Sequence, residues 1–275
     1  NIYNIAIKGT FDDCQNIVKE LFSEKKFREK INMSGVNSIN WSRIIFQIIY
    51  YFYAMFKIKK DKVNFSVPTG NFGDVYAGYI AKKMGLPIKK LIVATNENDI
   101  LQKVINTGVY KPESVKPSLS PSMDIQIASN FERLLFDALK HDDVEVNSLM
   151  NKLKNEGMFK LNSSSLNYIK ENFSSAKVSD DETKKIIKEI FDKYNFIIDP
   201  HTATAIKAND KIKDQTSTVT LATAHPYKFL ETVESVIGEK LEPPIQASFL
   251  GPKEKFDIID SNINNVKKYI ENKIN

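Results

Sequence analysis

The feature that most constrains this 275-residue sequence is a strand, a glycine loop and a helix between residues 62 and 85. Residues 62–66 alternate in polarity, and residues 75–85 have the pattern of an amphipathic helix closed by a glycine. The loop between them reads Val-Pro-Thr-Gly-Asn-Phe-Gly-Asp. In this arrangement backbone N–H groups and the positive end of the helix dipole converge on one point, which favours an anion. An ordinary connection capped by Asp74 is the alternative.

A second strand, predicted at residues 87–95, completes a βαβ unit and therefore predicts a parallel sheet with a right-handed crossover. Ligands of such sheets bind beyond the carboxyl ends of the strands. The glycine loop and the polar residues 96–99 both lie at that end. Further strands are predicted at residues 196–199 and 217–222, and residues 112–195 are predicted to be mostly helical.

The first 60 residues contain a strand, predicted at residues 1–8, and a helix that begins after Thr10. A long aromatic-rich helix is predicted from Trp41, and because Arg43 and Gln47 interrupt it, the segment falls short of an unbroken membrane span. The single cysteine, Cys14, is interpreted as a structural thiol and fits a reducing compartment.

Composition excludes several classes of function. Hydrophobic residues make up 42% and charged residues 27% of the chain, as in ordinary globular proteins. The net charge of +5 comes from scattered lysines without a basic stripe, so nucleic-acid binding is not predicted.

Seven short motifs stand in one order along the chain. They lie at residues 9–14, 36–41, 68–74, 95–99, 120–125, 199–203 and 223–226. Together they resemble threonine synthase, a pyridoxal-phosphate enzyme of the tryptophan-synthase β-like fold (type II). The resemblance implies an α/β fold class, with the parallel-sheet domain of that fold, a helical insertion and the remainder of a second, smaller α/β domain.

On this resemblance we expect three regions. Residues 1–58 are expected to form the remainder of the smaller domain and a connecting helix. Residues 59–240 are expected to form the large cofactor-binding domain, with the helical insertion at about 112–195. Residues 241–275 are expected to form a C-terminal tail and helix.

The implied activity is the conversion of O-phospho-L-homoserine and water into L-threonine and phosphate, with pyridoxal 5'-phosphate as cofactor. The implied partner is this small substrate, without nucleic acid or membrane, and oligomeric state is not predicted. The expected location is the cytoplasm, or an organelle if a targeting segment precedes this sequence.

The resemblance also assigns cofactor-binding residues. Thr223, at the end of a predicted strand, corresponds to the hydroxyl that binds the pyridine nitrogen, although an ordinary strand residue is the alternative. The loop expected to bind the cofactor phosphate consists of Gly70, Asn71, Phe72, Gly73 and Asp74.

Candidate substrate residues are less sharply defined. Asn37, Ser38 and Asn40 lie at a predicted turn before the long helix and are candidates for substrate contact, with helix capping as the alternative. Arg133 is a candidate for holding the substrate phosphate through two parallel hydrogen bonds, with an ion pair to nearby acids as the alternative.

The three histidines are not predicted to bind a metal. His201 follows a proline at a predicted helix start, so a structural hydrogen bond is the favoured interpretation. For His225 a structural hydrogen bond and a role in the site both stay open. His141, next to two aspartates, is interpreted as solvated.

The Schiff-base lysine that the resemblance requires is not found. Its expected context is Phe-Lys-Asp, whereas Lys57 and Lys160 follow phenylalanine but precede other residues. Lys228 lies in a His-Pro-x-Lys-Phe motif, in which the lysine is not the Schiff-base residue. We therefore expect no catalytic residue in this chain, which begins with Asn1, and interpret it as a C-terminal portion that is inactive alone.

Two alternatives stay open. One is a threonine-synthase-like phospho-lyase that releases phosphate and gives 2-oxobutanoate. The other is a non-catalytic module that binds the cofactor or phosphate. Product analysis distinguishes the phospho-lyase from the synthase, since threonine in place of 2-oxobutanoate rules out the lyase. If no lysine in the expected context precedes this sequence, the non-catalytic module becomes the favoured interpretation.

Overall fold

The computed structural model describes residues 2–245 and 255–274. The chain forms two compact units, which are described separately below. The larger unit is Val36–Glu242, and the smaller one combines Asn1–Gly35 with Pro243–Asn275.

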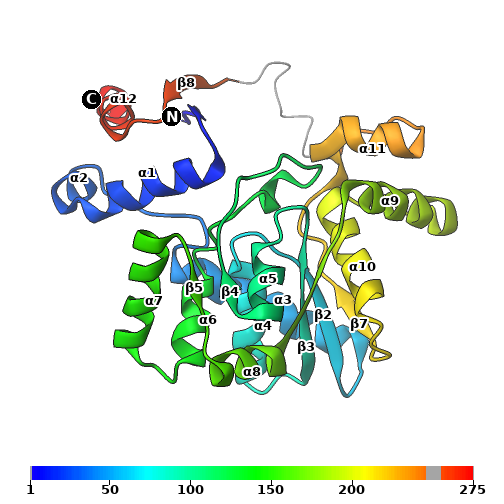
Figure 1. Cartoon of the computed structure of the whole chain (residues 1–275). Helices are drawn as coiled ribbons and strands as arrows, with labels where there is room; N and C mark the ends of the chain where they lie inside the picture. The colour runs from blue at the N-terminus through cyan, green and yellow to red at the C-terminus, as the bar shows by residue number, and fades with distance from the viewer. Residues whose placement is uncertain (1, 246–254, 275) are drawn as a thin grey trace. The chain divides into compact units, whose positions relative to one another are not determined.

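The larger unit is built on a four-stranded parallel sheet (Figure 1). Its order is β6 (Phe173–Lys177), β3 (Ile88–Thr95), β2 (Val63–Pro68) and β7 (Thr218–Thr220). The helix α4 (Gly73–Lys83) joins β2 to β3, which lie parallel to each other. The predicted βαβ unit is therefore confirmed.

Both faces of this sheet are covered, because alternate residues of each strand point to opposite sides. On β3, Leu91 and Val93 belong to the main apolar core, to which α3 (Trp41–Ile58), α4 and α5 (Ile100–Thr107) also contribute. The intervening Ile92 and Ala94 pack instead with the alanines of α10 (Pro200–Ile212). The carboxyl ends of the strands remain at one edge between these two layers.

The rest of the larger unit surrounds this framework. It contains the antiparallel pair β4 (Val109–Tyr110) and β5 (Phe159–Lys160). The other elements are the 3-10 turns η1 (Pro121–Met123) and η2 (Pro226–Phe229) and the helices α6 (Phe131–Ala138), α7 (Asp143–Glu156), α8 (Ser163–Asn172), α9 (Asp180–Tyr194) and α11 (Leu230–Ile237).

The prediction that residues 112–195 are mostly helical is confirmed, since α6, α7, α8 and α9 lie there, but it omitted β6, which pairs with β3. The sequence of β6, Phe-Ser-Ser-Ala-Lys, lacks β-branched residues and follows α8 directly, so it carries no strand signal. The strand predicted at residues 196–199 is wrong: Ile198 is buried in a cluster formed with α9 and α11, and no strand forms there.

The smaller unit contains a parallel pair of strands from opposite ends of the chain, β1 (Ile5–Lys8) and β8 (Asp257–Asp260). The strand predicted at residues 1–8 is confirmed only for Ile5–Lys8, and residue 1 lies outside the described residues. The helix start at Thr10 is as predicted, and the Thr10 and Asp13 side chains form a reciprocal cap. Its small apolar core includes Leu21 and Phe27. Its helices are α1 (Phe11–Ser23), α2 (Lys25–Lys30) and α12 (Ile263–Ile274).

Other predictions concern single features of these elements. Cys14 is half-buried, and burial together with Asp13 raises the pKa of its thiol, which disfavours a nucleophilic thiolate. Within the described ranges, no helix has both the length and the apolar character of a membrane span. The domain boundaries predicted at residues 58 and 240 stay predictions, although α3 packs within the larger unit.

Candidate functional site

The glycine loop follows β2 at the carboxyl edge of the sheet and ends at the first turn of α4. Phe72, the residue before this helix, has a left-handed backbone with φ of 65°, and no side chain caps the helix. The side chain of Phe72 is buried against Phe131 and Phe173, at ring-centre distances of 5.4 and 5.5 Å. Because the first N–H groups of an α-helix have no partner inside the helix, this uncapped start is suited to an anion.

The two loop glycines are required by the space around them. A Cβ on Gly70 would lie 2.6 Å from the backbone oxygen of Ser122. A Cβ on Gly73 would lie 2.6 Å from the Cβ of Ser38. Neither distance is compatible with normal packing, so glycine lets the segment around Ser122 and the turn at Ser38 both reach the loop.

Asn71 connects the loop to the start of α6 and to Ser38. Its side-chain oxygen accepts a hydrogen bond of 2.7 Å from the backbone of Ser129, and its amide donates to the Ser38 hydroxyl at 3.2 Å. The amide of Asn130 donates to both the backbone oxygen of Asn71, at 3.2 Å, and the Ser38 hydroxyl, at 3.3 Å. The structure therefore places one predicted substrate residue, Ser38, against the predicted phosphate loop.

The neighbours of Ser38 have different local roles. The side chain of Asn40 caps α3 by accepting a hydrogen bond of 3.0 Å from the backbone of Ser42. Helix capping is the alternative to substrate contact for this residue. Asn37 is exposed, and its side-chain oxygen accepts from the backbone of Ile39 at 3.2 Å. Substrate contact by Asn37, Ser38 and Asn40 stays a prediction.

Arg133 is fixed to the same turn. Its Nε donates to the side chain of Asn130 at 3.0 Å, and its Nη2 donates to the backbone oxygen of Ile39 at 3.1 Å. The guanidinium also lies 5.3 Å from the ring centre of Trp41. With Trp41 and Tyr76 it lines a cavity of about 530 Å³. Its contacts are thus to neutral groups, and its role toward phosphate stays a prediction.

Asp74 and Thr223 line a second cavity, of about 550 Å³, at the end of β7. Thr223 is exposed there. The Tyr51 hydroxyl lies 2.9 Å from both the Asp74 carboxylate and its backbone oxygen. Burial raises the pKa of the Asp74 carboxyl to about 6, although hydrogen bonds from Tyr50 and Tyr51 and the charge of Arg43 oppose that rise.

The sequence analysis missed the contribution of α3 to this second cavity. Arg43, Gln47 and Tyr50 line it together with Thr223. Their spacing of four and three residues places them on one side of the helix. That spacing is visible in the sequence, but only the fold shows that this side faces the end of β7.

The polar residues after β3 have a structural role. The buried amides of Asn96 and Asn98 donate to the carboxylate of Asp124 at 2.7 and 3.0 Å. The Ser118 hydroxyl donates to the same carboxylate at 2.6 Å. These bonds hold the segment that contains η1, and the backbone of Ser122 in that segment packs on Gly70.

The histidines do not gather at the site. His201 is buried, and its Nδ1 lies 3.0 Å from the carboxylate of Asp199, so the predicted structural hydrogen bond is confirmed. His225 caps η2, and exposed His141 lies 3.0 Å from Asp137. Within residues 2–245 and 255–274, no group of histidine, cysteine or acidic side chains has a metal-binding arrangement.

The lysines considered as Schiff-base candidates are all exposed. Lys57 lies in the last turn of α3, Lys160 lies in β5 and Lys228 lies in η2. In the part of the chain that the structure describes, no lysine lines either of the two cavities. The absence of a Schiff-base lysine from this chain stays a prediction.

Comparison with known sequences gives a consistent set of relatives. The family model described as "Threonine synthase, C-terminal" matches residues 202–270. Threonine synthases of Saccharomyces cerevisiae and Pseudomonas aeruginosa are each 44% identical to the chain, over 86% and 93% of its length. The chain covers 51% and 55% of those two proteins, so it spans about half the length of the curated relatives it matches.

Solved structures agree with these sequences. A PLP-bound threonine synthase from Brucella melitensis matches 98% of this chain with a TM-score of 0.87 and 42% identity, and the match covers 59% of that protein. Yeast threonine synthase matches 99% of the chain with a TM-score of 0.81 and 39% identity, and 59% of that protein is covered.

These structures define the class: the chain has the α/β fold of the type II PLP-dependent enzymes. The predicted fold class is therefore confirmed. Within that class, over the part that the matches cover, the chain belongs to the threonine synthase family.

Proposed function

We propose that this chain is the cofactor-binding portion of a threonine synthase, which converts O-phospho-L-homoserine and water into L-threonine and phosphate. The observation that carries the proposal is the uncapped start of α4 beside the cavity that Asp74 and Thr223 line. The same loop is the strongest motif of the sequence, and the relatives named above are threonine synthases.

Pyridoxal 5'-phosphate fits the donors of this region. In the described structure no side chain caps the N-terminus of α4, so the N–H groups of its first turn are suited to the cofactor phosphate. Asn71 and the two glycines hold the loop in this shape through contacts with Ser38 and Ser129. These contacts prepare the loop before the anion arrives, which lowers the cost of ordering it on binding.

The residues of the second cavity would serve the rest of the cofactor and the substrate. Bound pyridoxal phosphate supplies a ring that withdraws electrons from the substrate. The exposed Thr223 hydroxyl can bond the ring nitrogen, and as a neutral partner it withdraws less charge than a carboxylate. Arg43, the cation in this cavity's lining, can hold an anionic group of the substrate.

Arg133 has weaker support as the ligand of the substrate phosphate. It lines a different cavity from Thr223, and two of its donors are already used by Asn130 and Ile39. Ser38 has better support, because its hydroxyl lies beside the loop. We retain Asn37, Ser38, Asn40 and Arg133 as predicted substrate residues, and a cytoplasmic location likewise stays a prediction.

The proposal is tested by titrating the purified chain with pyridoxal phosphate and following the absorption spectrum, before and after borohydride and peptide mapping. We expect reversible binding with no trapped lysine. Thr223→Val should alter the spectrum of the bound cofactor, while Thr218→Val in β7, the strand that precedes Thr223, serves as the control. A chain that binds no cofactor contradicts the proposal, and a stoichiometrically trapped lysine, with Lys228 examined first, contradicts the predicted absence of that residue.

The reaction itself is tested after co-expression with the part of a threonine synthase that has no counterpart in this chain. Incubation with O-phospho-L-homoserine should give threonine and phosphate in equal amounts. Formation of 2-oxobutanoate in place of threonine would support the phospho-lyase. Cofactor binding without either product would support the non-catalytic module.

A further inference from the structure

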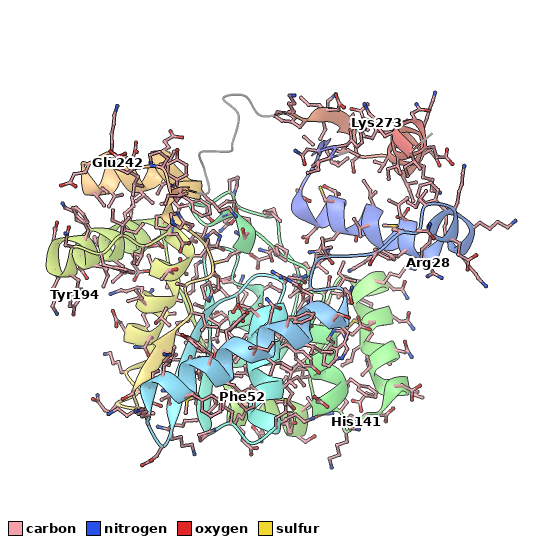
Figure 2. All side chains as sticks on the ribbon, turned by 180° about the vertical axis from the view of Figure 1, so that it is seen from behind. Arg28, Phe52, His141, Tyr194, Glu242 and Lys273 are labelled. Atoms are coloured by element: carbon pink, nitrogen blue, oxygen red, sulfur yellow. The ribbon has the colours of Figure 1, made fainter. Side chains whose placement is uncertain are left out.

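The cavity that Arg133 lines, called here the Arg133 cavity, is separate from the one that Asp74 and Thr223 line, and the two have no lining residue in common. Its volume of about 530 Å³ lies in the range of small-molecule sites. Figure 2 shows α3 running across the larger unit toward α6 and α7, with Phe52 labelled on α3 and His141 at the turn that joins α6 to α7. Side chains of these three helices and of α4 form the cavity.

One wall of the Arg133 cavity is a single side of α6. Glu132 and Arg133 lie four and three residues before Phe136, a spacing that places all three on one side of a helix. The opposite side of α6, which carries Leu134 and Leu135, is buried in the main apolar core. The core therefore holds α6 in place while its charged side faces the cavity.

The remaining walls are aromatic and apolar. Trp41 and Tyr76 meet edge to face with ring centres 6.3 Å apart, and Val146 of α7 also lines the cavity. Trp41 and Phe136 are each 41% exposed, so the protein itself covers only part of these two rings. Large aromatic rings gain free energy when an apolar group covers them, and this wall therefore favours a ligand with an apolar side chain.

The two charged residues differ in sign and are adjacent. Arg133 donates from Nε to Asn130 and from Nη2 to the backbone of Ile39, and in the described structure its Nη1 makes no hydrogen bond. Glu132 is exposed and forms no ion pair among the described residues. A carboxylate is suited to Arg133 and an ammonium group to Glu132. A phosphate dianion would satisfy Arg133 but would be repelled by the like charge of Glu132.

Hydrogen bonds connect the Arg133 cavity to the glycine loop. Asn130 accepts from Arg133 at 3.0 Å, and its amide donates to the backbone oxygen of Asn71 at 3.2 Å and to the hydroxyl of Ser38 at 3.3 Å. A ligand that fixes Arg133 therefore also fixes Asn130, the residue that holds the loop. A loop that is already ordered loses less conformational entropy when it binds an anion, so the coupling is expected to be favourable.

We propose that the Arg133 cavity binds an α-amino acid with an apolar side chain, with its carboxylate against Arg133 and its ammonium group against Glu132, and that the bound amino acid tightens cofactor binding at the loop. The coupling rests on the proposed function, because it takes the loop as the site of the cofactor phosphate. The substrate phosphate, which the sequence analysis considered for Arg133, is the competing ligand.

The test of the site uses the fluorescence of Trp41, the single tryptophan of the chain, which lines this cavity. The probes are L-leucine, 4-methylpentanoate, which lacks the amino group of leucine, and O-phospho-L-homoserine. We expect a saturable change with leucine and an affinity about tenfold lower for each of the other two probes. Glu132→Gln should weaken leucine binding about tenfold. Glu189→Gln is the matched control, because Glu189 is exposed on α9 and lies outside the cavity.

The test of the coupling uses pyridoxine 5'-phosphate, because its alcohol cannot react with an amino acid as the aldehyde of the cofactor would. At saturating leucine its affinity for the chain should rise about fivefold, and the affinity for leucine should rise by the same factor when pyridoxine 5'-phosphate is bound. Circular dichroism verifies that the variants fold.

The outcomes separate the site from the coupling. No saturable fluorescence change with leucine overturns the site. Equal affinity for leucine and 4-methylpentanoate, or full affinity in Glu132→Gln, contradicts recognition of the ammonium group and overturns it as well. Tighter binding of O-phospho-L-homoserine than of leucine would assign the cavity to the substrate. Leucine binding that leaves the affinity for pyridoxine 5'-phosphate unchanged refutes the coupling. A chain that binds leucine but neither pyridoxine 5'-phosphate nor the cofactor contradicts the proposed function and the coupling, and leaves the amino-acid site standing.

Discussion

Two helices that begin near the carboxyl edge of the same sheet differ in how their first turns are satisfied. At the start of α10 the carboxylate of Asp199 accepts from the backbone of His201 at 2.8 Å and from the hydroxyl of Thr202. At the start of α4 the preceding residue, Phe72, provides no side-chain cap. The first helix end is closed by the protein itself, whereas the second remains available to a ligand.

The carboxylates at these two ends have opposite pKa shifts. Burial acts to raise the pKa of Asp199, but hydrogen bonds from His201 and Thr202 outweigh it and lower the pKa below its ordinary value. Burial raises the pKa of Asp74 to about 6, and its tyrosine partners offset only part of that effect. A buried carboxylate that completes a helix cap is stabilised as an anion, and one beside an uncapped end is not.

The open end is maintained by packing. The left-handed backbone of Phe72, with φ of 65°, costs about 1–2 kcal/mol for a residue with a side chain. Burial of its ring between Phe131 and Phe173 offsets this cost. Strain of this kind is frequent at ligand sites, which agrees with the proposed role of the loop.

The largest expected effect is a loss of stability when the cap at the start of α10 is removed. Asp199→Ala removes the cap of α10 and leaves the buried His201 ring without its partner, which should cost about 3 kcal/mol of unfolding free energy. Urea denaturation measures this loss. Cofactor affinity should stay unchanged in the folded variant, because α10 packs on the other face of the sheet.

Asp142→Ala is the control for that prediction. Asp142 caps α7 through a 3.0 Å bond to the backbone of Glu145, but it is exposed. Its loss should cost about 1 kcal/mol or less. Equal losses at Asp199 and Asp142 would mean that burial and the histidine contact add nothing to the cap of α10.

Sequence reasoning located both helix starts, since Gly70–Asp74 and Asp199–Thr202 carry local signals that depend only on residue type. It left open whether Asp74 caps α4, because that depends on a partner distant in sequence, the Tyr51 hydroxyl, which the fold brings to the Asp74 carboxylate. It also missed β6, whose place in the sheet is fixed by pairing with β3.

The α3 contribution was missed for the same reason. Arg43 and Tyr50 lie in a helix that the sequence predicts correctly, but their position beside Thr223 results from tertiary packing. Conversely, a strand is predicted at residues 196–199 from the apolar residues Phe196 to Ile198, because a buried connection and a buried strand can have the same composition.

An intermediate effect is expected where the open end is held in place. Gly73→Ala puts a methyl group 2.6 Å from the Cβ of Ser38, and we expect a loss of about 2 kcal/mol in stability. Because the turn at Ser38 must move away from the loop, cofactor affinity should also fall, by about tenfold. Both quantities are measured on the purified variant by urea denaturation and cofactor titration.

The double variant Gly73→Ala with Ser38→Gly tests the physical reason. Removing the Ser38 side chain removes the atoms that the new methyl group would meet most closely. We therefore expect recovery of most of the stability, with less recovery of affinity because Asn71 loses its hydroxyl partner. If the double variant is as unstable as Gly73→Ala alone, the close contact with Ser38 is not the cause.

The smallest expected effect concerns the pH dependence of Asp74, whose pKa rises from an ordinary value of 3.8 to about 6 on folding. Between these two pH values the folded chain binds more protons at this group than the unfolded chain, so its contribution to stability falls as pH rises through the folded pKa and levels off only above about pH 7. The total change is about 1–2 kcal/mol, since water reaches part of this side chain.

Asp74→Asn keeps an oxygen for the Tyr51 hydroxyl and cannot ionise. The stability of Asp74→Asn relative to the unsubstituted chain should therefore rise between pH 4 and 6 in urea denaturation. A flat difference would mean that this carboxylate is satisfied as an anion, like Asp199, and that the two helix ends differ only in geometry.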